Sequence, residues 1–263
     1  MSDLSPRDLE ELAHAKEALE RPSLAIRIAD RLGMPVEALV KRLPEGAQRI
    51  VARGTHRALD AALELALRTL DRGTGPASDA VHRGLAVAMG ALGGAAGFAG
   101  LVLELPLSTA LMLRSIADHA RAQGEDVSLV ETRLECLTVF AYGSRSAADD
   151  AADSAYFAVR AALGRAVSQA AEYVAQRGAA GAAAERTAPA LLHLLSRVAQ
   201  RFGVTVADKA AAQLVPIIGA AGGAAVNALF IDHFQSTARA HFTVRRLVRA
   251  HGEDAVRRAY VGV

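Results

Sequence analysis

The sequence predicts an all-α protein: a single globular helical domain with two central glycine-rich apolar helices that are related by an internal repeat. Apolar residues make up 52% of the 263 residues but aromatics only 4%, and alanine accounts for most of the apolar excess. Alanine is the strongest helix former, and apolar residues recur at spacings of three and four along most of the chain. No segment shows the alternation of a strand. The length allows one large domain or two small ones, and we take one.

Charge and cysteine content narrow the class further. Thirty basic residues nearly balance twenty-eight acidic ones, for a net charge of +2, so no overall field favours nucleic acid. The basic residues also lack neighbouring aromatics on which bases could stack. The single Cys136 excludes an internal disulfide and lies on an apolar helical pattern, which predicts a small buried side chain. The N-terminus is acidic and amphipathic rather than a secretory signal, so we expect a cytoplasmic protein that does not bind nucleic acid.

The N-terminal elements follow from capping signals and helical spacing. Ser5 is a typical N-cap, and Pro6 after it suits the first position of a helix. Two short amphipathic pieces come next, and a longer helix is predicted over 46–71. We treat 1–44 as an N-terminal helical extension and 45–263 as the main domain.

The remaining elements include two long apolar runs. Between 85 and 113 the only charged residue is Glu104, which suits a membrane span or a buried helical hairpin. A second uncharged run covers 210–231. Alanine and glycine contribute little insertion energy, so we do not expect stable spanning. Further helices are predicted around 130–140 and over 154–177, "RGAAGAAAERTAP" is linker-like, and the chain ends in a basic helix, "FTVRRLVRAHGEDAVRRAY".

The two apolar runs contain near-copies of one motif, "GALGGAA" and "GAAGGAA". After a one-residue slip, Glu104 aligns with Asp232, and both copies continue to a Gly-Glu-Asp sequence at 124–126 and 252–254. An ordered series over more than thirty residues indicates a duplication. Each copy is predicted to contain a glycine-rich apolar helix with an acid near its end, followed by a second helix that ends at Gly-Glu-Asp.

In both runs glycines recur four residues apart, so they line one helical face and allow another backbone to approach closely. Glycine in a helix costs about 0.5 to 1 kcal/mol relative to alanine, so several together need compensation from close packing. We therefore expect the two glycine faces to pack against each other or against a partner. Tight packing in a soluble helical core explains the glycine spacing at least as well as membrane dimerisation does. Pro106 and Pro216 are expected to break the two helices as hinges or ends. The face glycines are Gly90, Gly93, Gly94, Gly97, Gly219, Gly222 and Gly223.

Three polar residues interrupt the apolar segments: Glu104, Asn227 and Asp232. Each is costly to bury without a partner. The aligned positions of Glu104 and Asp232 suggest a common role, either in pairing with an arginine or in marking where each helix emerges into water. The arginines considered for such pairs are Arg114, Arg239 and Arg245.

These segments resemble the EcsC protein family of bacteria. "GALGGAAGFAGLVLELPLSTALMLRSIADHARAQGED" is similar to the glycine-rich stretch of that family, which leads to an acid-Leu-Pro sequence and a Gly-acidic turn. "KAAAQLVPIIGAAGGAAVNALFIDHFQSTARAHFTVRRL" is similar to a second block, through Lys209, Pro216, Gly219 and Asn227. The resemblance covers roughly 45–260. It implies a helical intracellular protein, in some relatives encoded beside membrane transport machinery, without an established set of catalytic residues.

The motifs of common enzyme classes are missing or incomplete. No glycine-rich phosphate loop follows a strand, and no nucleophile on a "GxSxG" turn accompanies the histidines. Glu11 and His14 could share a di-iron helix face, but the second Glu-x-x-His is not found, so they are expected on a surface helix. His241, Arg245 and Arg249 are interpreted as a basic stripe on a solvated helix. We expect no catalytic residues, cofactor or metal.

Two functional hypotheses remain. The favoured one is a non-enzymatic, peripherally membrane-associated or lipid-binding helical protein, an accessory to membrane transport machinery at the inner face of the cell membrane. Its partner would be a membrane surface or a lipid, and a protein partner is a second option. The sequence does not determine the oligomeric state. Its alternative is a soluble hydrolase with a site near Glu104, Asp232 and His233. The residues expected to face anionic headgroups are Arg239, Arg245, Arg246 and Arg249.

Overall fold

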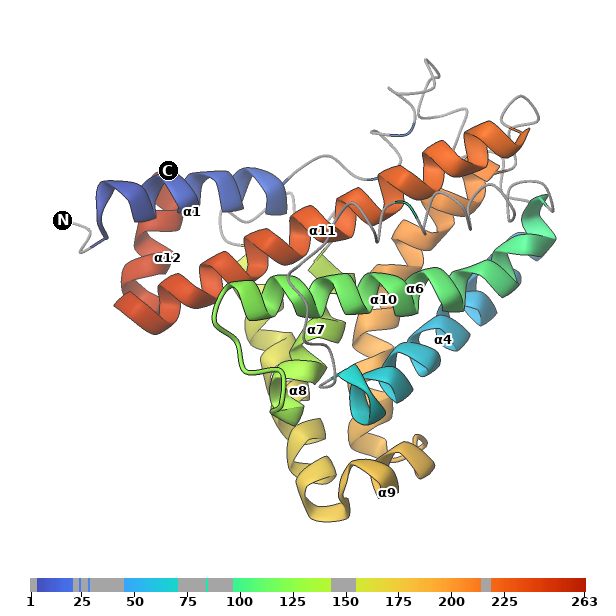
Figure 1. Cartoon of the computed structure of the whole chain (residues 1–263), viewed down its shortest axis with the longest axis horizontal. Helices are drawn as coiled ribbons and strands as arrows, with labels where there is room; N and C mark the ends of the chain where they lie inside the picture. The colour runs from blue at the N-terminus through green and yellow to red at the C-terminus, as the bar shows by residue number, and fades with distance from the viewer. Residues whose placement is uncertain are drawn as a thin grey trace.

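Every regular element in the described part of the chain is an α-helix, which confirms the predicted class (Figure 1). The structure is a computed structural model. Its helices are α1 (Pro6–Leu19), α4 (Glu45–Arg68), α6 (Gly97–Ala122), α7 (Val130–Tyr142), α8 (Ala155–Arg177), α9 (Ala179–Ala184), α10 (Pro189–Gln213), α11 (Gly219–His251) and α12 (Glu253–Gly262). It describes residues 4–20, 24, 28, 45–70, 84, 97–142, 155–213 and 219–263, with the backbone alone at 45, 97–103, 155, 213 and 219–223.

The first helix begins where the sequence predicts. The Ser5 side chain accepts a hydrogen bond from the backbone N–H of Asp8 at 3.2 Å, and Pro6 occupies the first turn. This N-cap satisfies one of the N–H groups that a helix start leaves without a partner. α1 packs on α11 and α12, and the Lys16 ammonium donates to the backbone oxygen of Val263 at 2.8 Å. The described helix of the predicted N-terminal extension is therefore packed on the main domain.

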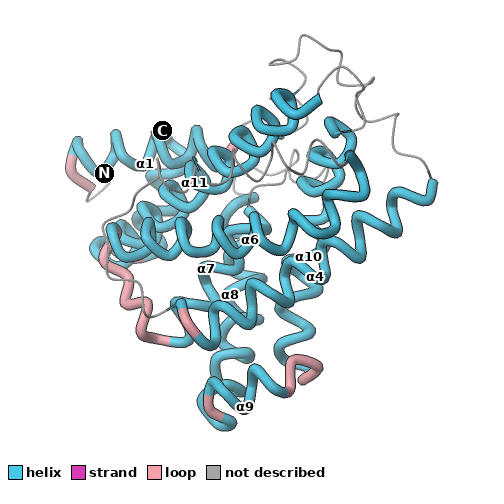
Figure 2. The backbone as a smooth tube through the Cα atoms, turned by 45° about the vertical axis from the view of Figure 1, so that its right-hand side comes forward, coloured by secondary structure: helices cyan, strands magenta, loops and turns pink. Residues whose placement is uncertain are grey.

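α7 is the central helix of the core. All its side chains from Thr132 to Tyr142 are buried, because α4, α6, α8, α10 and α11 pack against it. Phe140 of α7 contacts Phe202 of α10, with 4.9 Å between ring centroids, and Phe234 of α11, with 5.2 Å. Figure 2 shows α7 and α8 beneath α6 and α11, with α9 at the far end of the molecule. The core thus joins helices from both halves of the chain.

α6 and α11, the helices that contain the two copies of the predicted repeat, pack against each other. The Gln235 side-chain amide donates to Ser115 Oγ at 2.9 Å, which links the two helices. α11 runs unbroken through Asp232, and α6 runs unbroken through Glu104 and Pro106. Within the described residues, the predicted change from one helix to a second near Glu104 and Asp232, with a break at Pro106, is therefore wrong. A proline removes one backbone hydrogen bond, and the packing of α6 on α4 and α11 holds the helix together across that loss.

Each copy of the predicted repeat has, at its end, a glycine in the left-handed backbone region. Gly124 has φ 77° and Gly252 has φ 83°. Glycine adopts this conformation at little cost, and it is the usual helix C-terminal signal. The C-terminal basic segment, predicted as one helix, therefore divides at Gly252 into α11 and α12.

The other predicted elements that lie in the described residues agree with the structure except in one place, and the two short amphipathic pieces before α4 lie outside those residues apart from 24 and 28. α8 at Ala155–Arg177 matches the helix predicted over 154–177, and α4 matches the one predicted over 46–71. The linker-like segment contains the short helix α9, in a run of alanines that favours helix. Within the described ranges, no helix is long and apolar enough to cross a membrane.

Candidate functional site

Two of the polar residues within apolar segments, Glu104 and Asn227, form a buried cluster with Lys209, named here the Lys209 cluster. They come from α6, α10 and α11. The Lys209 ammonium donates to Glu104 Oε1 at 2.6 Å and to Asn227 Oδ1 at 2.7 Å, and it lies 4.6 Å from the centroid of the Phe230 ring. The Lys209 side chain is fully buried and that of Glu104 is 4% exposed. These hydrogen bonds connect α6, α10 and α11 inside the core.

Burial and charge act in opposite directions on the Lys209 cluster. Desolvation lowers the pKa of the Lys209 amine, and the charge and hydrogen bond of Glu104 oppose this effect. Breaking a buried pair by removal of one partner costs about 3 to 5 kcal/mol, because the other charge loses its compensation. The arrangement is a structural tie, since the amine is held between two side-chain oxygens inside the core.

The predicted partner of Glu104 is corrected by this geometry. Glu104 pairs with Lys209, whereas Arg114 donates to the Thr69 hydroxyl and Arg245 binds Glu125. Glu104 is also buried inside α6 rather than placed at a helix end. The physical reason is that α10 packs with its Lys209 side chain beside Glu104 in the interior. The sequence around Glu104 does not reveal this long-range contact.

A second buried cluster, named here the His241 cluster, comprises Glu135, Tyr156, His241 and Arg245. The Tyr156 hydroxyl lies 2.8 Å from His241 Nδ1, and His241 Nε2 lies 3.1 Å from Glu135 Oε1. The Arg245 guanidinium lies 3.3 Å from the same carboxylate oxygen. The Tyr142 ring stacks on the imidazole, with 4.5 Å between centroids. The cluster joins α7, α8 and α11.

Burial sets the protonation states in the His241 cluster. Desolvation lowers the His241 pKa, although Glu135 opposes it, so the neutral imidazole donates from Nε2 to the carboxylate and accepts from Tyr156 at Nδ1. Burial raises the pKa of the Tyr156 hydroxyl, and it also raises the pKa of the Cys136 thiol. Neither group is therefore an activated nucleophile, although hydroxyl, imidazole and carboxylate follow one another as in hydrolases. The predicted burial of Cys136 is confirmed.

The predicted basic stripe on α11 is largely internal. The His241 side chain is fully buried, and that of Arg245 is 23% exposed and binds Glu125 at 2.9 Å. Arg249 also pairs with Glu125, and Arg246 pairs with Glu11. The prediction of a solvated stripe is wrong for His241 and Arg245, because carboxylates from distant segments lie against this face. The positive charge of this face is therefore paired with carboxylates of the same protein and is not available to lipid headgroups.

The other predicted site residues on α11 differ in burial. Asp232 is half-buried and Arg239 is exposed, while His233 is buried. Gly97, Gly219, Gly222 and Gly223 lie within α6 and α11. The residues outside the described ranges are Gly90, Gly93, Gly94 and Pro216.

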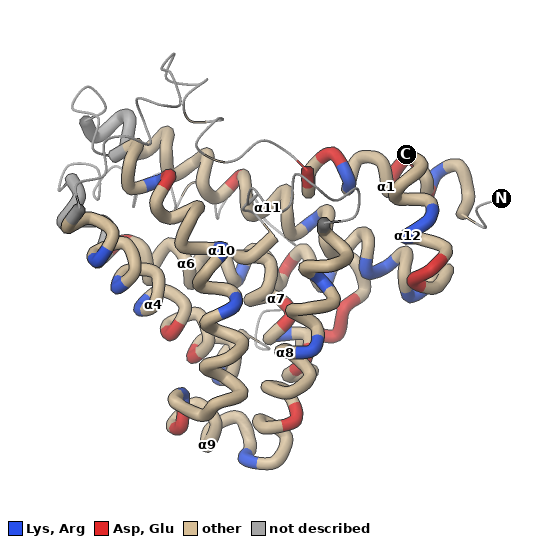
Figure 3. Tube along the Cα trace, turned by 180° about the vertical axis from the view of Figure 1, so that it is seen from behind, with Lys and Arg blue, Asp and Glu red and all other residues tan. Residues whose placement is uncertain are grey.

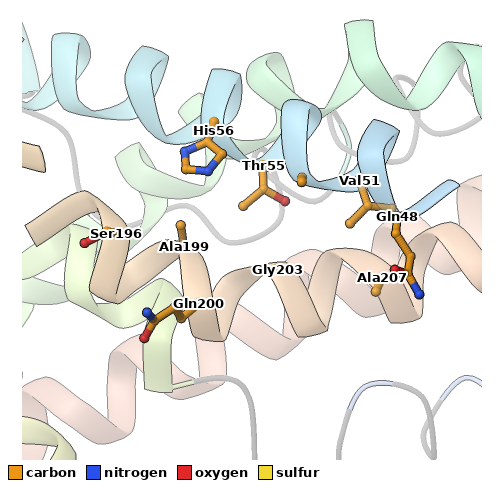
Figure 4. A pocket seen from close by; sticks show the side chains of 10 residues that line it. Gln48, Val51, Thr55, His56, Ser196, Ala199, Gln200, Gly203 and Ala207 are labelled. Carbon is orange, nitrogen blue, oxygen red and sulfur yellow. The ribbon is translucent and has the colours of Figure 1, made fainter. Parts of the chain in front are cut away.

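A cleft of about 480 Å³ lies between α4 and α10 (Figure 4). Its α10 wall carries small residues at Ala199, Gly203 and Ala207, and Ala52 continues this small-residue lining on α4. The Thr55 side chain extends from α4 towards α10, and its buried hydroxyl has no hydrogen-bond partner. The remaining lining residues are Gln48, Val51, His56, Ser196 and Gln200.

The exposed side of α4 carries a row of arginines, named here the α4 stripe: Arg49, Arg53 and Arg57. They are four residues apart, so they lie on successive turns of one face. All three are exposed, and no carboxylate in the described part of the chain forms an ion pair with any of them. Figure 3 shows basic positions along the outer side of α4. The stripe follows the cleft residues Gln48 and Ala52 by one position, about 100° further round the helix.

The profile of the EcsC protein family matches residues 7–247, more than nine-tenths of the chain. The chain belongs to the EcsC protein family. The match includes the whole Lys209 cluster and both helices of the cleft in this EcsC protein. It also begins within α1, ahead of the predicted start of the main domain at 45. Comparisons with curated proteins and with solved structures gave no match.

Sequence reasoning on this EcsC protein missed the α4 stripe, the cleft and the His241 cluster. A signal for the stripe was present, because Arg49, Arg53 and Arg57 share one helical face of an amphipathic segment. Lys209 and Asn227 were both marked by the family resemblance, without an indication that they meet Glu104. The cleft and the His241 cluster depend on contacts between segments that are far apart in the chain.

Proposed function

We propose that this EcsC protein is a non-enzymatic protein that attaches peripherally to an anionic membrane surface through the exposed face of α4. The observation that carries the proposal is the α4 stripe, three exposed arginines on successive turns without carboxylate partners in the described part of the chain. A role beside membrane transport machinery, which the family resemblance implies for some relatives, is part of the same proposal.

Electrostatics favour α4 over α11 as the attachment face. A basic residue near an anionic surface contributes about 1 kcal/mol, so three together contribute roughly 3 kcal/mol. Arg245, Arg246 and Arg249 of α11 are paired with carboxylates, which cancel most of their field. Screening limits the attraction to about 10 Å at 0.1 M salt, so only a face that contacts the surface counts. An exposed row on one helix meets this condition.

The hydrolase alternative receives no comparable support. Glu104 is held by Lys209 inside the core, and none of Glu104, Asp232 and His233 lines the α4/α10 cleft. A general acid or base needs access to a substrate proton. A carboxylate that is 4% exposed and paired with an ammonium does not have it.

Vesicle sedimentation tests the proposal. The purified chain should sediment with vesicles of phosphatidylcholine and phosphatidylglycerol but stay in the supernatant with phosphatidylcholine alone. Binding should weaken as salt rises from 50 to about 300 mM, because the attraction is electrostatic. The triple variant Arg49→Gln, Arg53→Gln, Arg57→Gln should lose most of the binding. Equal binding to neutral vesicles, or none to anionic ones, would overturn the proposal.

A further inference from the structure

We propose that the α4/α10 cleft holds the acyl chain of an anionic amphiphile, with the anionic headgroup on the α4 stripe. The inference rests on the proposed function for the class of ligand, and it adds a defined binding site for one lipid molecule.

The dimensions of the cleft suit a narrow flexible chain. Its volume of about 480 Å³ lies within the roughly 300 to 1,000 Å³ of small-molecule sites. The α4 wall from Gln48 to His56 extends about 12 Å at 1.5 Å per residue. A helix about 10 Å wide would occupy roughly 900 Å³ over that length, so a partner helix would lie mostly outside the cleft. An extended acyl chain fits inside.

The walls suit an apolar occupant. Ala52, Ala199 and Ala207 line the cleft with methyl groups, and a Cβ added to Gly203 would meet no atom within 4 Å. Burial of this apolar surface against methylene groups is favourable, at about 25 cal/mol per Å².

The polar groups of the site suit the other end of the amphiphile. Thr55 lines the cleft, and its buried hydroxyl lacks a partner, although buried polar groups in proteins nearly always have one. A ligand carbonyl would supply the missing acceptor. Arg49 and Arg53 stand beside the same helix face, and the guanidinium group binds carboxylate or phosphate with two parallel hydrogen bonds. Apolar walls, one unpaired hydroxyl and a cationic edge together match an anionic lipid.

Uptake of a single chain can be measured without vesicles. Cis-parinaric acid, a fluorescent fatty acid, should bind with a stoichiometry of one molecule per protein molecule, and lysophosphatidylglycerol should displace it. Gly203→Leu should weaken uptake roughly tenfold or more, because the added side chain fills the cleft. That variant should still fold, since the site has room and leucine is a better helix former than glycine. Gly164→Leu, at another helical glycine with open space, is the matched control and should bind as wild type does.

The headgroup and its source are tested with three further ligands or variants. The double variant Arg49→Gln, Arg53→Gln should bind cis-parinaric acid more weakly than wild type. Its affinity for an uncharged monoacylglycerol should equal that of wild type. Inorganic phosphate alone should not displace the probe; displacement would identify a phosphate site instead and overturn the proposal. Unchanged uptake in Gly203→Leu would also overturn it.

The two proposals fail separately. Vesicle sedimentation of Gly203→Leu should equal that of wild type, because the stripe is intact. Anionic vesicle binding combined with no uptake of cis-parinaric acid would remove the cleft site and leave the proposed function standing. Uptake without vesicle binding would remove the membrane function, and the cleft would remain a site for free anionic amphiphiles.

Discussion

The ammonium of Lys209 lies 2.6 Å from the carboxylate of Glu104, although 105 positions separate the two residues in the chain. Both are buried, and Asn227 accepts a second hydrogen bond from the same ammonium. The pair therefore fixes α6, α10 and α11 relative to one another.

Removal of one member of this pair should destabilise the fold strongly. Lys209→Met leaves Glu104 buried without its cation and should lower the free energy of unfolding by about 3 to 5 kcal/mol. The double variant with Glu104→Leu should recover much of that loss, because no uncompensated charge remains. Urea unfolding followed by circular dichroism measures the double-mutant cycle. Strictly additive effects would show that the two residues do not interact.

Stability should fall in mild acid because His241 is buried in its neutral form. Its pKa is lowered from the ordinary value of 6.5 by desolvation, so the unfolded chain binds more protons below pH 6.5. The free energy of unfolding then decreases as pH falls, by at most about 1.4 kcal/mol per pH unit for one group.

A comparison of urea unfolding at pH 7.5 and 5.5 isolates this contribution. The pKa of Glu135 is lowered by His241 and Arg245 despite its burial, so that carboxylate stays charged throughout the window. His241→Gln should unfold more easily at pH 7.5 but lose less stability between the two values than wild type. An identical loss in both proteins would assign the pH dependence to other groups.

The glycines that follow α6 and α11 should resist substitution. Gly124 and Gly252 have φ of 77° and 83°, where a Cβ costs about 1 to 2 kcal/mol. Gly124→Ala and Gly252→Ala should each lower thermal stability accordingly. Gly164→Ala is the control, since this helical glycine has open space around its Cα and should gain about 0.5 to 1 kcal/mol. A neutral Gly252→Ala would mean that the turn relaxes.

Thr55→Val should stabilise the ligand-free protein. The substitution removes a buried hydroxyl without a partner and keeps the branched shape, so a gain of about 1 kcal/mol is expected. Thr138→Val is the matched control, because that buried hydroxyl donates to the backbone oxygen of Glu135 at 2.7 Å. It should destabilise the protein. Thermal unfolding of both variants should therefore show shifts of opposite sign.

Local signals predicted much of the fold. The Ser5 N-cap, the extent of α8 and the glycines that follow α6 and α11 all depend on interactions within one or two turns. Apolar spacing of three and four identified the helices because each must bury one face. The continuity of α6 through Pro106 was not predicted, because tertiary packing offsets the lost hydrogen bond.

The site depended on contacts that spacing does not encode. Arg245 and Arg249 have the pattern of a solvated stripe, yet Glu125 comes from a segment more than 100 positions away and pairs with both. Arginine occurs on solvated faces and in buried ion pairs alike, because its stem can pack against apolar groups. Glu104 was recognised as needing a partner, but packing of α10 decided that the partner is Lys209.

The position of charge, rather than its total, is the central feature of the proposed function. The triple variant Arg49→Gln, Arg53→Gln, Arg57→Gln and the triple variant Arg165→Gln, Arg257→Gln, Arg258→Gln remove the same charge from exposed sites. Arg257 and Arg258 lie on α12, which Figures 1 and 3 show at the opposite end of the molecule from α4, and Arg165 lies on α8. Affinity for phosphatidylglycerol vesicles should fall about a hundredfold in the first variant and change little in the second. Equal losses in both variants would contradict attachment through α4.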